Sequence, residues 1–158
     1  MEIIYTYRTE IDEKLKNILV QEQCYSYETN IGDSPAQIVK MMNQLFRMDK
    51  LAEEYVYLLA LNTRCNIIGI FEILHGNVDG SIYKPREVII RALLCGASGI
   101  ILVHNHPGKT TNPSESDIKV MRRMREACDL VGIVLFDSII IGNDYYSFKE
   151  NERIEIIG

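Results

Sequence analysis

Two nearly continuous apolar runs constrain the fold of this chain more than any other feature. They span residues 55–61 and 98–103, and both have the length of a strand rather than that of a helix. A strand that is apolar on both faces must be covered on both faces, as in sheets that lie between layers of helices. We therefore expect an α/β (α+β) fold with a mixed β-sheet flanked by helices.

The first part of the chain is expected to be less regular. Apolar side chains at helical spacing predict a short amphipathic helix over residues 9–20, and these are Ile11, Leu15, Ile18 and Leu19. Residues 21–33 are mostly polar and predict a loop or an edge strand. Ser34 begins a firmer helix, because Ser-Pro-Ala-Gln supplies an N-cap, a first-turn proline and a capping-box glutamine. We predict an N-terminal helical or irregular extension over residues 1–33 and one domain over residues 34–158.

Strands and helices alternate in the rest of this domain. Periodicity, caps and turn residues predict a strand at 67–74, a helix at 85–94, a helix from Ser114 to about Asp129, a strand at 133–136 and a hairpin at 138–148. The strand at 67–74 follows a short polar turn, so it should form a hairpin with residues 55–61. The last hairpin should turn at residues 142–144. The sum is a sheet of about five or six strands.

Charge and cysteine content narrow the functional classes. The formal net charge of -5 argues against a broad face for binding nucleic-acid phosphates. The cysteines contain no C-x-x-C pair and are expected to be reduced and mostly buried; they are Cys24, Cys65, Cys95 and Cys128. The acidic N-terminus lacks the basic flank and apolar run of a signal peptide, and no run approaches about 20 apolar residues. We therefore expect a cytoplasmic protein without a membrane span.

Two of the chain's three histidines, His104 and His106, follow a buried strand one residue apart. In extended backbone, side chains at this spacing point to the same side, with Cα atoms about 6.5–7 Å apart, so both imidazoles can chelate one ion. Asp117 begins the next helix, where the helix N-terminus favours a charged carboxylate. A catalytic zinc takes three protein ligands and leaves one position for water. The sequence thus predicts a metal site on these three residues.

Each part of this pattern has a simpler explanation on its own. Ser114-x-x-Asp117 is a capping box, and histidines in exposed loops are common. All four residues in order, at loop length after a buried strand, favour a metal site. Capping and ligation are compatible roles for one helix end, and Ser114 would lie on the rim of the same pocket.

The string H-x-H, seven residues, Ser, two residues, Asp resembles the JAMM (JAB/MPN) metalloprotease motif, and within that superfamily the chain is most similar to the RadC family. Further strings that carry the resemblance are Leu61-Asn-Thr-Arg64, Pro85-Arg-Glu-Val88, Val103-His-Asn-His-Pro107 and Ile139-Ile-Ile-Gly142. The resemblance covers about residues 35–150. It implies a JAMM/cytidine-deaminase-like fold and one Zn²⁺ per chain, held by His104, His106 and Asp117.

The resemblance also implies a general base, a glutamate just before the first central strand. Here that position is Glu54, and a carboxylate beside zinc is what amide hydrolysis needs. Glu72, in the second strand of the hairpin, is the alternative base. Ser114 would hydrogen-bond the developing oxyanion.

The implied function is zinc-dependent hydrolysis, with a peptide or protein as substrate. The alternative is a non-catalytic RadC-like module associated with DNA repair or protein interaction. The letters His-Asn-His do not indicate an HNH nuclease, because that motif spreads its residues over a ββα unit. We expect no counterpart in the short N-terminus of the helix-hairpin-helix region found ahead of many RadC domains, which weakens the case for a direct DNA role. Two departures from the family, His106-Pro-Gly-Lys-Thr110 for HPSGD and Asp137-Ser138 for Asp-His, leave the ligands intact.

Overall fold

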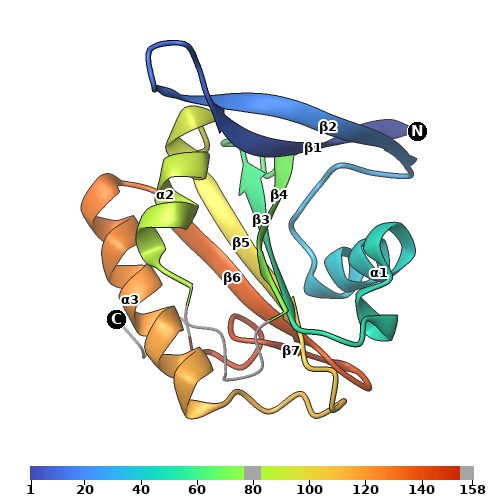
Figure 1. Ribbon diagram of the computed structural model, residues 1–158. Helices are drawn as coiled ribbons and strands as arrows, with labels where there is room; N and C mark the ends of the chain where they lie inside the picture. The colour runs from blue at the N-terminus through green and yellow to red at the C-terminus, as the bar shows by residue number, and fades with distance from the viewer. Residues whose placement is uncertain (77–82, 154–158) are drawn as a thin grey trace.

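A seven-stranded mixed sheet forms the centre of the computed structural model, which describes residues 1–76 and 83–153 (Figure 1). In chain order the elements are β1 (Glu2–Ile11), β2 (Asn17–Tyr27), α1 (Pro35–Phe46), the 3-10 turn η1 (Met48–Lys50), β3 (Tyr55–Leu61), β4 (Ile67–His75), α2 (Pro85–Leu94), β5 (Gly99–Asn105), α3 (Glu115–Val131), β6 (Val134–Ile141) and β7 (Tyr145–Ser147). The strand order is β2-β1-β4-β3-β5-β6-β7. The sheet is mixed because β3 is antiparallel to β4 and β5, whereas β5 and β6 are parallel. The predicted fold class is confirmed.

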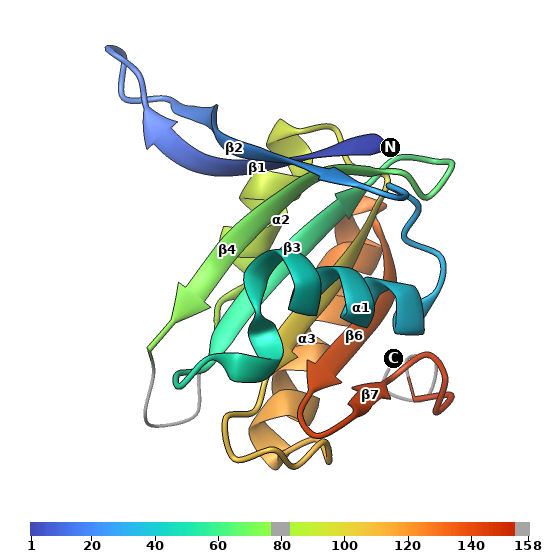
Figure 2. The same ribbon diagram turned by 90° about the vertical axis from the view of Figure 1, so that its right-hand side faces the viewer.

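Helices cover both faces of this sheet (Figures 1 and 2). α2 and α3 lie against one face, and α1 lies against the other. Alternate residues of β3 serve the two faces: Leu58 and Ala60 pack with α2 and α3, while Leu59 and Leu61 pack in the cluster under α1. All four side chains are fully buried. The first apolar run is therefore a central strand covered on both faces, as predicted.

Two helices begin at the serines that the sequence identified as caps. Ser34 Oγ accepts a hydrogen bond from the backbone N–H of Gln37 at 3.5 Å at the start of α1. Ser114 Oγ accepts one from the backbone N–H of Asp117 at 3.0 Å at the start of α3. Gly96, the predicted end of α2, has a φ of +69°, a conformation that costs glycine little.

The helix predicted over residues 9–20 is wrong, because this region forms the β1–β2 hairpin. Asp12 Oδ1 holds the turn by accepting hydrogen bonds from the backbone N–H groups of Lys14 and Lys16, at 2.8 and 2.9 Å. Leu15 lies in that turn with a φ of +60° and is exposed, so it is not part of an apolar helix face. β1 pairs in parallel with β4, and the hairpin therefore extends the central sheet. The edge strand offered for residues 21–33 is present as part of β2; the domain boundary at residue 33 stays a prediction.

A single strand, β6, takes the place of the strand predicted at 133–136 and of the first strand of the hairpin predicted at 138–148. β6 runs through Asp137 without a break, and its pairing with β5 shifts register beside Phe136. The predicted hairpin turn at residues 142–144 is confirmed between β6 and β7. Asp137 is buried and accepts hydrogen bonds from Ser147 Oγ at 2.5 Å and from the backbone N–H of Lys149 at 3.0 Å. This side chain ties residues 147–149 to β6.

The cysteines differ from expectation in their burial. All four are free, but only Cys128 is buried, while Cys24 is exposed on β2. Cys24 lies on an edge strand, where one side of the backbone has no neighbouring strand to cover it. Among the described residues, no helix has both the length and the apolar character needed to cross a membrane.

Candidate metal centre

The three residues predicted as metal ligands meet at the carboxyl end of β5. His104 is the penultimate residue of this strand, and His106 follows its last residue. Their Nε2 atoms are 3.2 Å apart. Asp117, in the first turn of α3, places Oδ1 at 3.3 Å from Nε2 of His104 and Oδ2 at 3.2 Å from Nε2 of His106. A buried strand and the helix that follows it thus bring two nitrogens and a carboxylate to one point.

These separations fit a zinc ion. Zinc bonds of about 2.0–2.1 Å at tetrahedral angles place two ligand atoms about 3.3 Å apart. The observed separations of 3.2, 3.2 and 3.3 Å match that value for each pair of residues. Imidazole nitrogen and carboxylate oxygen are also ligand types that zinc accepts. Three protein ligands leave a fourth position for water or substrate.

The two histidines are held differently. Nδ1 of His106 lies 3.0 Å from the backbone carbonyl of Thr110, to which it donates a hydrogen bond in the tautomer that leaves Nε2 free as a ligand. His104 is 4% exposed, and its Nδ1 has no hydrogen-bond partner among the described residues. His104 is thus oriented by its burial and by the contact of its Nε2 with Asp117, and His106 also by the loop that follows it.

Asp117 combines capping with a position in the metal site. The backbone N–H of Ser114 donates to Oδ2 of Asp117 at 2.8 Å, which completes a reciprocal capping box. Burial opposes ionisation of Asp117, but hydrogen bonds from His104 and His106 outweigh it and hold the pKa of this carboxyl well below its usual range. The hydrogen bond to Asp117 in turn raises the pKa of His106. The carboxylate is thus charged and ready to bind a cation.

Glu54 joins this group from the start of β3, the strand next to β5. It is half-buried, directly precedes β3, and contributes a carboxylate oxygen to a cluster with His104, His106 and Asp117 whose ligand atoms all lie within 4.8 Å of one another. Its neighbour Glu53 is exposed. The position of Glu54 suits a base that acts on a water molecule at the vacant coordination site.

Glu72, the alternative base, lies on the other face of the sheet. It is paired with Tyr57, whose ring packs at 4.9 Å from that of Phe46 in α1. Its side chain lines a cavity of about 420 Å³ beside Arg8 and Tyr57. Residues directly opposite in a strand pair share a face, so the α1 side of Tyr57 is also the side of Glu72. The structure brings Glu54 to the three ligands and leaves Glu72 away from them.

Tyr83 is a further residue near the site that the sequence did not indicate. Burial raises the pKa of Tyr83, and the negative charges of Asp117 and Glu54 raise it further. Its hydroxyl therefore stays protonated close to the carboxylates. No local pattern marks this tyrosine, because it precedes α2 and packs on the core cluster that α2 and α3 share.

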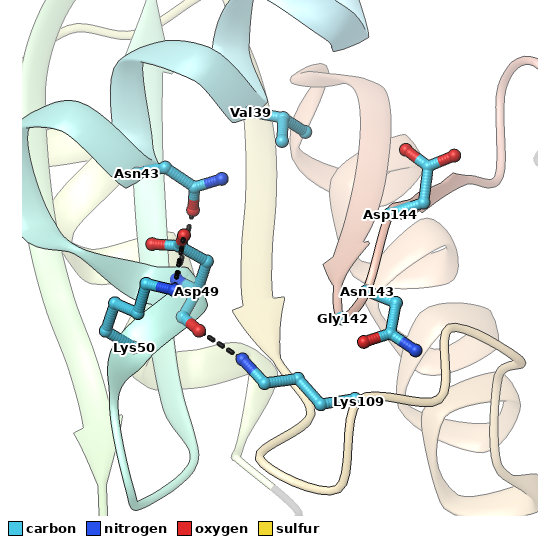
Figure 3. Close-up of a pocket in the computed structure, with 8 residues that line it drawn as sticks. All are labelled: Val39, Asn43, Asp49, Lys50, Lys109, Gly142, Asn143 and Asp144. Carbon is cyan, nitrogen blue, oxygen red and sulfur yellow. Dashed lines mark hydrogen bonds and ion pairs between the residues drawn. The ribbon is translucent and has the colours of Figure 1, made fainter.

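The loop after His106 is anchored at Lys109, which reaches toward Asp49 of η1 and lies beside the β6–β7 turn (Figure 3). The ammonium group of Lys109 donates a hydrogen bond to the backbone carbonyl of Asp49, across a cavity of about 300 Å³. The backbone N–H of Asn143 donates to the carbonyl of Lys109 at 2.9 Å. Gly142 packs so closely that a Cβ there would lie 2.5 Å from the same carbonyl. This anchoring fixes Thr110, and with it the orientation of His106.

Several known proteins are similar in sequence to most of this chain. A model of the RadC-like JAB domain matches residues 32–153. The chain is 42% identical over 122 residues to a UPF0758 protein of Alkaliphilus metalliredigens, covering 77% of this chain and 52% of that protein. It is 44% identical over 108 residues to a UPF0758 protein of Alkaliphilus oremlandii, covering 68% and 47% of the two chains. A UPF0758 protein of Streptococcus suis is 42% identical over 103 residues, covering 65% and 42%. The chain spans about half the length of the curated relatives it matches.

Proposed function

This chain belongs to the RadC-like JAB domain family, and we propose that it is a zinc-dependent hydrolase of the JAMM type that acts on peptide or isopeptide bonds. The observation that carries the proposal is the convergence of His104, His106 and Asp117 at 3.2–3.3 Å from one another, with Glu54 beside them. That set supplies three ligands and one base. Hydrolysis of an amide at a zinc site needs both.

In this proposal the three ligands, Glu54 and Ser114 have different roles. A zinc ion held by the three ligands would supply Lewis-acid chemistry, polarising a carbonyl and making water acidic enough to lose a proton near neutral pH. Glu54 would accept that proton and return it to the leaving amine. Ser114, whose Oγ already accepts the N–H of Asp117, has a hydroxyl hydrogen left to donate to the developing oxyanion.

A non-catalytic module is the competing proposal for this family member. A scaffold that holds only a structural ion has no need of a carboxylate at the open coordination position. Here the carboxylate of Glu54 lies within 4.8 Å of the three ligand groups, close enough to act on a water molecule bound there, whereas its neighbour Glu53 is exposed. The presence of a base with the ligands favours catalysis.

Replacement of Glu54 by glutamine tests this function. Glu54→Gln keeps the size of the side chain and removes its basicity, so turnover should fall by about 10²- to 10⁴-fold while bound zinc stays unchanged. The assay is cleavage of a pooled library of peptides and isopeptide-linked peptides, followed by mass spectrometry, with bound zinc measured by elemental analysis.

Glu72→Gln is the matched control, because it makes the same change on the other face of the sheet. It should cleave the library as the wild type does. Equal turnover of Glu54→Gln and wild type would remove Glu54 as the base. A library left intact by zinc-loaded wild type would favour the non-catalytic module.

A further inference from the structure

Asn105, between the two histidines, is a buried amide with two backbone partners. It is 1% exposed. Its Oδ1 accepts a hydrogen bond from the backbone N–H of Tyr55 at 2.7 Å, and its Nδ2 donates one to the backbone carbonyl of Glu53 at 2.9 Å. These two backbone groups lie on either side of Glu54. One side chain is therefore hydrogen-bonded to the backbone immediately before and immediately after the proposed base.

These two hydrogen bonds take the place of backbone hydrogen bonds between β3 and β5, which stop one residue earlier. The β3–β5 ladder ends with the pair Val56 and His104. Beyond it, the backbone of β5 continues along β6, where Asn105 is paired with Ile141. The Asn105 side chain bonds to the segment before Val56 instead, and so continues the contact between β5 and β3 by one residue. On the other side of the same segment, the carbonyl of Glu54 accepts the N–H of Gly76 at 3.0 Å.

Asparagine is suited to this place by its chemistry. A short planar amide offers one acceptor and a donor side by side, as a peptide group does. Aspartate of the same shape keeps the acceptor but has no donor for Glu53, and its charge would face a carbonyl oxygen. Burial of Asn105 leaves little access for water to replace a lost bond, so either partner would remain unsatisfied.

We infer that Asn105 is the positioning residue of Glu54: its amide fixes the backbone of residues 53–55 so that the Glu54 carboxylate stays beside the metal ligands. The catalytic part of this inference rests on the proposed hydrolase function. A displacement of about 1 Å at a reacting group can lower a rate by about 100-fold. The two hydrogen bonds of Asn105 would therefore affect the rate of hydrolysis through the position of Glu54, without contact with the metal. The same strand end thus supplies two ligands and, between them, the support for the base.

The test compares Asn105→Ala and Asn105→Asp with Asn62→Ala. Asn62 is the matched control, because its Oδ1 accepts backbone N–H groups of Arg64 and Asn66 at the far end of β3. Either Asn105 variant should lower kcat about 10- to 100-fold on a peptide that wild type cleaves, with KM and zinc content unchanged. In a Glu54→Gln background the same variants should cause no further loss, because they act through Glu54. An equal fold-loss in both backgrounds would overturn the inference.

A second measurement reads the contact itself and needs no substrate. Amide exchange followed by NMR should show the N–H of Tyr55 exchanging about tenfold faster in Asn105→Ala, with the N–H of Leu58 unaffected. The visible spectrum of the protein loaded with Co²⁺ alone should change in the same direction in Asn105→Ala and in Glu54→Gln. Unchanged Tyr55 exchange and an unchanged spectrum would overturn the inference. If Asn105→Ala does not fold, Asn105→Asp retains the acceptor for Tyr55 and carries the kinetic and spectral tests.

The two proposals can fail separately. If wild type cleaves no peptide, the hydrolase function fails, while the Tyr55 exchange and the Co²⁺ spectrum still decide whether Asn105 holds the backbone at Glu54. If wild type cleaves peptides and the Asn105 variants match it, only the positioning role fails.

Discussion

Protons and a metal ion compete for the same atoms at the candidate centre. Nε2 of His106 lies 3.2 Å from Oδ2 of Asp117, and this contact raises the pKa of His106 in the metal-free protein. A raised pKa means that His106 is protonated over a wider range of pH than an ordinary imidazole, whose pKa is about 6.5. Because zinc binds only the neutral ring, its affinity must depend on pH.

The predicted direction is loss of zinc affinity as the pH falls through the raised pKa of His106. Displacement of one proton should weaken binding about tenfold for each pH unit below that pKa. Competition with a chromogenic chelator between pH 8 and pH 5, corrected for protonation of the chelator, measures this dependence. His106→Gln, which has no titrating ring, should lose the His106 part of it. An affinity that stays constant over this range would contradict the account.

The residue pattern alone predicted the three candidate ligands, whereas the preference for Glu54 over Glu72 as the base came from the family resemblance. His104, His106 and Asp117 belong to one strand, one loop and one helix start, so local periodicity places them. The choice between Glu54 and Glu72 depends on which face of the sheet each residue occupies. The β3–β4 pairing shifts register beside Tyr57, and a shift of one residue moves a side chain to the other face. Asn105 and Tyr83 were missed for the same reason, since their partners lie far away in the chain.

At the scale of elements, the loop between β5 and α3 connects the metal site to the β6–β7 turn. Thr110 accepts the hydrogen bond from His106, and Lys109 receives the N–H of Asn143. Gly142 allows this approach, because its missing Cβ leaves room for the Lys109 carbonyl. We therefore expect the turn residues to influence metal affinity by holding the loop that orients His106.

Gly142→Ala should lower both stability and zinc affinity. The added Cβ would lie 2.5 Å from the carbonyl oxygen of Lys109 and 2.9 Å from that of Thr110, both backbone atoms that cannot simply rotate away. A loss of about 1–3 kcal/mol in the free energy of unfolding is expected, as for other overpacked sites. Denaturant unfolding of the metal-free protein and zinc competition measure the two effects.

Gly108→Ala is the control in the same loop, since a Cβ there would meet nothing within 4 Å. It should change the free energy of unfolding by less than about 0.5 kcal/mol. Equal behaviour of the two alanine variants would show that the close approach at Gly142 does not constrain the loop.

The elements that were predicted correctly are those with strong local signals. β3 and β5 are continuous apolar runs, and α1 and α3 begin at serine caps. The N-terminal hairpin was missed because Ile11, Leu15 and Ile18 happen to fall at helical spacing, although all three are exposed. The better signal was the density of β-branched and aromatic residues at positions 3–7, which favours a strand. Pairing of β1 with β4 then outweighed the helical pattern.

At the scale of the whole molecule, the residues of the candidate site gather where the start of β3 meets the end of β5. β3 and β5 lie next to each other, and the start of β3 brings Glu54 beside the end of β5, which carries the histidines. The antiparallel pairing of these strands is what makes this meeting possible. The family match over residues 32–153 includes both strands and α3, and it begins after the β1–β2 hairpin. The hairpin lies at one edge of the sheet, whereas the candidate site lies at its central strands.

X-ray absorption at the zinc edge, on protein loaded with one equivalent of zinc, tests the central claim most directly. Only nitrogen and oxygen neighbours are expected around the zinc, at about 2.0–2.1 Å, with an imidazole contribution from two histidines. Asp117→Ala should lose most of its zinc in parallel elemental analysis. A sulfur neighbour at about 2.3 Å, or undiminished zinc in Asp117→Ala, would show that the metal is held elsewhere and would contradict the account.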